Sequence, residues 1–185
     1  MIISEIVHCL SAIAAEEAIK VLVIRAAGKH FCAGHFLAEM VDGGVREYKI
    51  IFDQCTHMMQ MIHDIPQPLI AQVQGVATAP GCQLAAWCDL VVAEEGAQFA
   101  TPGVKIGLFC TTPSVAVSRA IGRKAAMEML LTGRYFPARE AKQISITEIP
   151  NPKPIYDFEE RTFQFAVLVI EYWMLRFTLR LYSGW

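Results

Sequence analysis

The sequence predicts an α/β protein in which short buried strands alternate with helices. Apolar and β-branched runs at 21–26, 69–75 and 89–95 are typical of buried strands. Between the first two runs, over 45–65, apolar residues recur at steps of three and four, which indicates a helix with one apolar face. The chain has 185 residues and a formal net charge of −2, so it fits one domain and lacks the basic excess of a nucleic-acid-binding protein.

The remaining elements follow from local signals along the chain. Helical composition predicts a helix over 2–19, and Pro66 and Pro68 end the helix over 45–65. Pro80 suits the first turn of a helix, where a missing N–H costs nothing. The other predicted elements are a helix over 80–88, a strand over 97–102, and helices over 113–121, 124–131 and 137–143.

The character of the chain changes after residue 143. We therefore expect a core domain over 1–143, followed over 144–185 by a proline-rich linker and an aromatic, apolar tail. Nine of the 18 aromatic residues lie between Tyr156 and Trp185. Apolar residues at helical steps predict a helical tail, although apolar residues also occupy its opposite side. The tail is interpreted either as a membrane-surface or partner-binding helix, or as an end foreign to the core.

Several classes of site and location are not supported by the sequence. The six cysteines form no CxxC pair and the five histidines form no HExxH motif, so no metal site is predicted. The start of the chain has no targeting signal, and we expect a location in the cytoplasm or the mitochondrial matrix. Four polar residues interrupt the apolar segment over 163–181, so we expect no membrane span.

Two glycine-bearing turns are the candidate functional feature. The turns over 30–35 and 75–83 each follow a predicted buried strand, and the second runs into a helix. If the two turns face one another, their backbone N–H groups can point at a single oxygen atom, as an oxyanion hole requires. Glycine turns after strands are common, so their spacing alone does not decide the chemistry.

The segments KHFCAGHFLAEM (29–40), IPQPLIAQVQGVATAPGCQLAAWCDL (65–90) and FATPGVKIGLFCTTP (99–113) resemble the crotonase superfamily, the enoyl-CoA hydratase/isomerase family. The resemblance covers about residues 1–143. It implies a spiral of ββα turns that binds acyl-CoA thioesters in fatty-acid metabolism, with the coenzyme A thioester as substrate and no resident cofactor. Family members usually trimerise through C-terminal helices. This sequence does not match the family's ends, so we expect an incomplete core and no secure trimer.

The resemblance also implies roles for individual residues. The first oxyanion-hole N–H falls on His35 and the second on Pro80, which has no N–H. Gly81 is the candidate substitute donor. The remaining positions line the family's substrate path: Lys29, Ala33 and Leu37 near the adenosine and pantetheine, and Leu108 near the acyl pocket.

Both catalytic glutamates of active hydratases are replaced here. Their positions fall on Gln83 and Gly103, which we count with the substrate-binding positions. Water addition needs a carboxylate base and a carboxylic acid, and neither residue supplies one. The sequence therefore predicts an acyl-CoA-binding family member with weak or no hydratase activity. Two alternatives stay open: a non-enzymatic fragment that acts through its tail, and an enzyme of other chemistry such as thioester hydrolysis.

Overall fold

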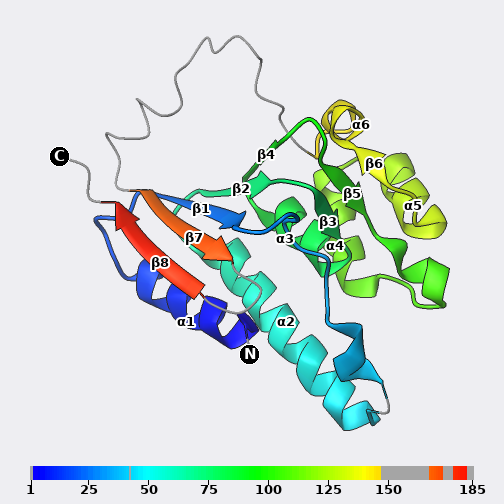
Figure 1. The fold of residues 1–185 in the computed structure, drawn as a ribbon, viewed down its shortest axis with the longest axis horizontal. Helices are drawn as coiled ribbons and strands as arrows, with labels where there is room; N and C mark the ends of the chain where they lie inside the picture. Colours follow the sequence, from blue (N-terminus) through cyan, green and yellow to red (C-terminus); the bar gives the residue numbers. More distant parts are fainter. Residues whose placement is uncertain (1, 42, 147–166, 173–176, 183–185) are drawn as a thin grey trace.

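A computed structural model describes residues 2–41, 43–146, 167–172 and 177–182 (Figure 1). The helices are α1 (Ile2–Ala14), α2 (Val45–Asp64), α3 (Pro80–Trp87), α4 (Thr111–Ala120), α5 (Arg123–Thr132) and α6 (Ala138–Gln143), with 3-10 helices η1 (Leu37–Met40) and η2 (Pro102–Ile106). The strands are β1 (Val21–Ala26), β2 (Leu69–Val73), β3 (Val76–Thr78), β4 (Leu90–Ala93), β5 (Gln98–Ala100), β6 (Phe136–Pro137), β7 (Val167–Tyr172) and β8 (Phe177–Tyr182).

The predicted α/β class is confirmed, and the strands form two sheets. The larger sheet has the order β4-β2-β1-β7-β8, and the smaller sheet has the order β3-β5-β6. The chain passes from β2 in the larger sheet to β3 in the smaller one, and then into α3. It repeats this path through β4 and β5. The parallel pairs β2–β4 and β3–β5 show that successive repeats stack in register, which is the expected ββα spiral.

The first repeat of the spiral is abbreviated. Strand β1 lies in the larger sheet and pairs in parallel with β2, with Leu22 opposite Leu69. Between β1 and α2, the described residues add only Cys32 to the smaller sheet, through a parallel bridge with Ala77 of β3. The first turn is therefore attached directly to the strand that leads into the second turn.

The prediction of a helical tail is wrong for the part of the tail that is described. Residues 167–172 and 177–182 form strands β7 and β8. Strand β7 pairs in parallel with β1, so Val169 lies opposite Val23, and it pairs in antiparallel fashion with β8. The sequences VLVIEY and FTLRLY are rich in β-branched and aromatic residues, which favour strands. An apolar segment with no polar side also gains little from forming a surface helix.

Helices α1 and α2 lie side by side along one side of the larger sheet (Figure 1). The apolar face of α1 consists of Ile6, Leu10 and Ile13, all buried. Helix α2 buries Cys55, Met58, Met59 and Ile62, the apolar stripe predicted from its sequence. These two faces belong to one apolar core with β1 and β2. Among the described residues, no helix is long and apolar enough to cross a membrane.

Candidate functional site

The two predicted turns pack against each other. The backbone N–H of Cys32 donates to the carbonyl oxygen of Val76 (3.1 Å), and the N–H of Thr78 donates to the carbonyl oxygen of Cys32 (2.9 Å). The Thr78 hydroxyl donates to the carbonyl oxygen of Ala33 at 3.0 Å. Thr78 is only 5% exposed, so these bonds are shielded from water. These hydrogen bonds fix the position of the first turn relative to the residues that lead into α3.

Close contact between Gly34 and Pro80 brings the turns together at their tips. Gly34 has a φ of +101°, and a β-carbon there would lie 3.1 Å from Cδ of Pro80. This backbone conformation is costly for other residues, and an added β-carbon would press against the proline ring. One residue further, a β-carbon at Gly81 would collide with the carbonyl oxygen of Cys32. Two glycines are therefore required for the approach of the turns.

Helix α3 begins at this contact, from a strained residue. Ala79 precedes the helix with φ 51° and ψ −120°, a conformation that costs a non-glycine residue on the order of 1–3 kcal/mol. Its N–H donates to the carbonyl oxygen of Ala100 in the neighbouring repeat, at 2.9 Å. Pro80 follows as the first helical residue, as predicted. Strain of this kind is concentrated at functional sites, which supports these turns as the candidate site.

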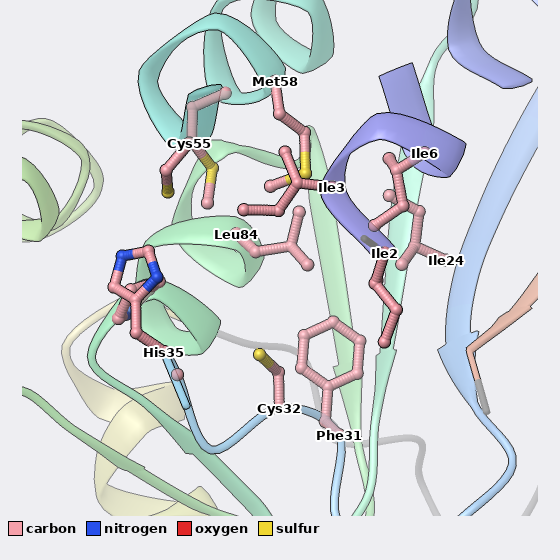
Figure 2. A pocket seen from close by; sticks show the side chains of 13 residues that line it. Ile2, Ile3, Ile6, Ile24, Phe31, Cys32, His35, Cys55, Met58 and Leu84 are labelled. Atoms are coloured by element: carbon pink, nitrogen blue, oxygen red, sulfur yellow. The ribbon is translucent and has the colours of Figure 1, made fainter. Parts of the chain in front are cut away.

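An apolar cavity of about 70 Å³ opens at the two turns (Figure 2). The tips of the turns contribute Gly34, His35 and Pro80 to its wall, the start of the first turn contributes Phe31 and Cys32, and none of the lining residues carries a carboxylate. The imidazole of His35 packs edge-on against Phe52, with the ring centroids 5.5 Å apart. The other lining residues are apolar or sulfur-bearing: Ile2, Ile3, Ile6, Ile24, Cys55, Met58, Met59 and Leu84.

The sequence did not indicate that α1 and α2 line a cavity. Sequence patterns predict α2 only as a helix with one apolar face and α1 only as a helix. The stripe of Cys55, Met58 and Met59 supplied the only signal, and a core-facing helix carries the same pattern. A cavity in an apolar core is a property of packing, which residue spacing does not reveal.

The two positions at which the resemblance places the family's glutamates differ in their surroundings. Gln83 is 4% exposed, and its side-chain oxygen finds no hydrogen-bond partner among the described residues. The space beside Gly103 is occupied: a β-carbon there would lie 2.6 Å from the carbonyl oxygen of Leu108 and 2.8 Å from Sγ of Cys110. The segment after η2 therefore occupies the space that a side chain at Gly103 would need.

Of the predicted site residues, His35 and Pro80 line the cavity and the others do not. Lys29, just before the first turn, and Ala33, within it, are exposed, and the carbonyl oxygen of Ala33 accepts a hydrogen bond from Thr78. Leu37 and Leu108 are 54% and 51% exposed. Gly81 and Gln83 lie in α3 beyond Pro80, and Gly103 lies in η2. The assignments taken from the resemblance remain predictions for these residues.

The thiols of the site are poor nucleophiles. Burial, followed by the nearby Cys32 thiol, raises the pKa of Cys55 to about 11. Burial also raises the pKa of Cys32, although a backbone hydrogen bond from Gly34 opposes the shift. In α3, burial and then the Cys110 thiol raise the pKa of Cys82 to about 12. These cysteines are protonated near neutral pH, so they serve as small apolar groups. The described residues contain no cluster of histidine, cysteine or carboxylate side chains suited to a metal ion.

Comparison with known proteins identifies the family of this chain. The enoyl-CoA hydratase/isomerase family model matches residues 1–165, and the chain belongs to that family. It is 49% identical over 129 residues to the mouse protein named enoyl-CoA hydratase domain-containing protein 3, mitochondrial. This match covers 69% of the chain and 43% of the mouse protein. The human protein of the same name is 48% identical over 124 residues, covering 66% of the chain and 41% of that protein.

Solved structures agree with the fold. An enoyl-CoA hydratase of Mycobacterium smegmatis has a TM-score of 0.79 and 44% identity, covering 86% of this chain and 63% of the other. Human enoyl-CoA hydratase domain-containing protein 3 has a TM-score of 0.76 and 40% identity, covering 88% of this chain and 65% of the other. The crotonase fold expected from the sequence is confirmed. The chain spans less than half the length of these two curated relatives.

Proposed function

We propose that this chain binds the acyl group of coenzyme A thioesters at the two turns. The observation that carries the proposal is the apolar cavity that opens at Gly34, His35 and Pro80. The backbone N–H of His35 donates to the thioester carbonyl oxygen, and the acyl chain enters the cavity. An apolar cavity with a polar group at its mouth suits a ligand that has a carbonyl at one end and a hydrocarbon at the other.

The same residues favour binding over hydration. Pro80 has no N–H, and the loss of one oxyanion-hole donor typically lowers turnover about 10²–10³-fold. Gly81 supplies an N–H only after a shift of its turn, which its packing against Cys32 opposes. No carboxylate lines the cavity, Gln83 carries an amide, and Gly103 has no side chain. A hydratase needs a group to deliver water and a group to protonate carbon, and neither is present at these positions.

Cofactor, partner and location follow from the same proposal. The coenzyme A thioester is itself the ligand, and the proposed activity requires no resident cofactor. A protein that binds acyl-CoA thioesters fits a role in fatty-acid metabolism. The mouse and human relatives carry the word mitochondrial in their names, which supports the mitochondrial matrix over the cytoplasm.

Calorimetric titration with butyryl-CoA tests the proposal, with free coenzyme A as the matched control. We expect saturable binding of the thioester and weaker binding of coenzyme A, because only the thioester places carbons in the cavity. Crotonyl-CoA hydration is followed in parallel through the absorbance of the unsaturated thioester. Equal affinities for the two ligands contradict the proposed acyl site, and turnover comparable with an ordinary hydratase contradicts the proposed loss of hydration.

A further inference from the structure

Helix α1 and strand β1 line the cavity on the side away from His35. Ile6 of α1 and Ile24 of β1 lie across the cavity from His35 (Figure 2). Both are firmly packed, with exposed fractions of 7% and 6%. An acyl chain that starts at His35 and runs into the cavity therefore meets branched side chains that belong to the core.

The volume of the cavity limits the number of carbons that it can hold. A cavity of roughly 150 Å³ lined by Leu, Ile and Phe accepts benzene, which has six carbons. The cavity at the turns measures about 70 Å³, roughly half of that. By proportion it accommodates about three carbons beyond the thioester carbonyl. A longer chain must displace buried side chains, and inserting methylenes into a packed core is unfavourable.

We infer that Ile6 sets the acyl-chain length that this protein accepts, and that the ligands are short straight-chain acyl-CoA thioesters of up to about four carbons. The inference rests on the proposed function, because the thioester carbonyl must sit at the turns for the chain to point toward Ile6. Ile6 acts as a wall that the ligand's terminal methyl group contacts. Its side chain contributes shape and no chemistry.

A series of thioesters measures this limit directly. Acetyl-, propionyl-, butyryl-, hexanoyl- and octanoyl-CoA are titrated into the natural chain. Each methylene that enters the cavity is expected to tighten binding about fourfold, the equivalent of the ~0.8 kcal/mol gained by burying one CH₂ group. The gain in affinity is expected to continue from acetyl-CoA to butyryl-CoA and to stop there. The longest acyl chain that still gains affinity is called the break in the series. A gain that continues unbroken to octanoyl overturns the inference.

Helix α1 offers a matched pair of variants. Ile6 and Ile13 are buried isoleucines on the same face of the same helix, and only Ile6 lines the cavity. Ile6→Ala removes three carbons from the wall, so we expect the break in the series to move from butyryl to hexanoyl. Ile13→Ala is expected to lose a similar amount of stability and to leave the break at butyryl. Ile6→Val, which removes one carbon, serves if the alanine variant does not fold, with pentanoyl-CoA added to the series.

The outcomes separate the inference from the proposed function. If no thioester binds the natural chain, the proposed function fails, and the inference fails with it. If thioesters bind but the break stays at butyryl in the folded Ile6 variant, the acyl site stands and Ile6 is not its limit. If both alanine variants move the break equally, general loosening of α1 explains the shift and the inference is overturned.

Discussion

Gly34 and Pro80 lie in close contact where the two turns of the site meet: a β-carbon on Gly34 would lie 3.1 Å from Cδ of the proline ring. Gly34→Ala is expected to lower the free energy of unfolding by about 1–3 kcal/mol, since φ is +101° at this position. Urea unfolding measures the change. Gly28→Ala is the control, because a β-carbon there meets nothing within 4 Å. Equal losses for the two variants would show that the turns do not constrain each other.

Pro80→Ala restores a backbone N–H at the start of α3. One added hydrogen bond contributes about 1 kcal/mol, so the variant is expected to bind butyryl-CoA about fivefold more tightly than the natural chain. The stability of the helix should change little, because the first N–H of a helix has no partner within it. Calorimetry measures the affinity, and free coenzyme A serves as the control ligand. An unchanged affinity would mean that this N–H does not reach the thioester carbonyl.

Gly103→Ala tests whether the position at which the resemblance places the second glutamate is closed to a side chain. The added β-carbon would lie 2.6 Å from the backbone oxygen of Leu108, so the loop must shift, and we expect a loss of about 1–3 kcal/mol in unfolding stability. Gly96→Ala is the control, because its nearest neighbour is Oε1 of Glu94 at 3.9 Å. A neutral effect at Gly103 would indicate a loop that opens easily, which would leave space for a glutamate.

Local signals in the sequence were sufficient to predict the α/β class and most of the elements of the core, whereas the spiral arrangement of these elements was implied only by the resemblance to a known family. Periodicity located α2, and Pro80 located the start of α3. The cavity depends on how α1 and α2 settle on the sheet, and no spacing rule contains that information. The tail was predicted as a helix because its apolar residues satisfy a helical step, yet a segment such as VLVIEY satisfies a buried strand equally well. The partner strand β1 decided between the two, and this pairing joins residues far apart in the sequence.

Arg134 forms an ion-pair network with Glu128 and Glu140, and its guanidinium lies over the ring of Phe136 at 3.6 Å from the centroid. Hydrogen bonds from Arg134 hold the pKa of Glu140 below its usual range. The folded state therefore binds this proton less readily than the unfolded state, and the stabilisation is present at neutral pH and lost as the pH falls.

Glu140→Gln is expected to lower unfolding stability by about 0.5–1 kcal/mol at pH 7, the range of a well-oriented surface pair. The difference from the natural chain should shrink as the pH falls below the ordinary glutamate range of about 4. Thermal unfolding at several pH values measures it. Asp53→Asn is the control, since the Lys49–Asp53 pair is more exposed and should contribute less. A difference that persists undiminished at pH 3 contradicts an ionic origin.

Strand β7 is bordered on one side by β1 and on the other by β8, and Val169 lies at its centre, opposite Val23 and Arg180. Val169→Pro removes a backbone N–H from this ladder, and proline is found in sheets only at edges, strand starts and bulges. We expect faster hydrogen exchange at the β1 amides that face β7, because the strand that covers them is displaced. Exchange in β5, which belongs to the other sheet, is the internal control. Unchanged exchange throughout β1 would show that β7 does not protect this edge, and that the tail contributes nothing to the stability of the spiral core.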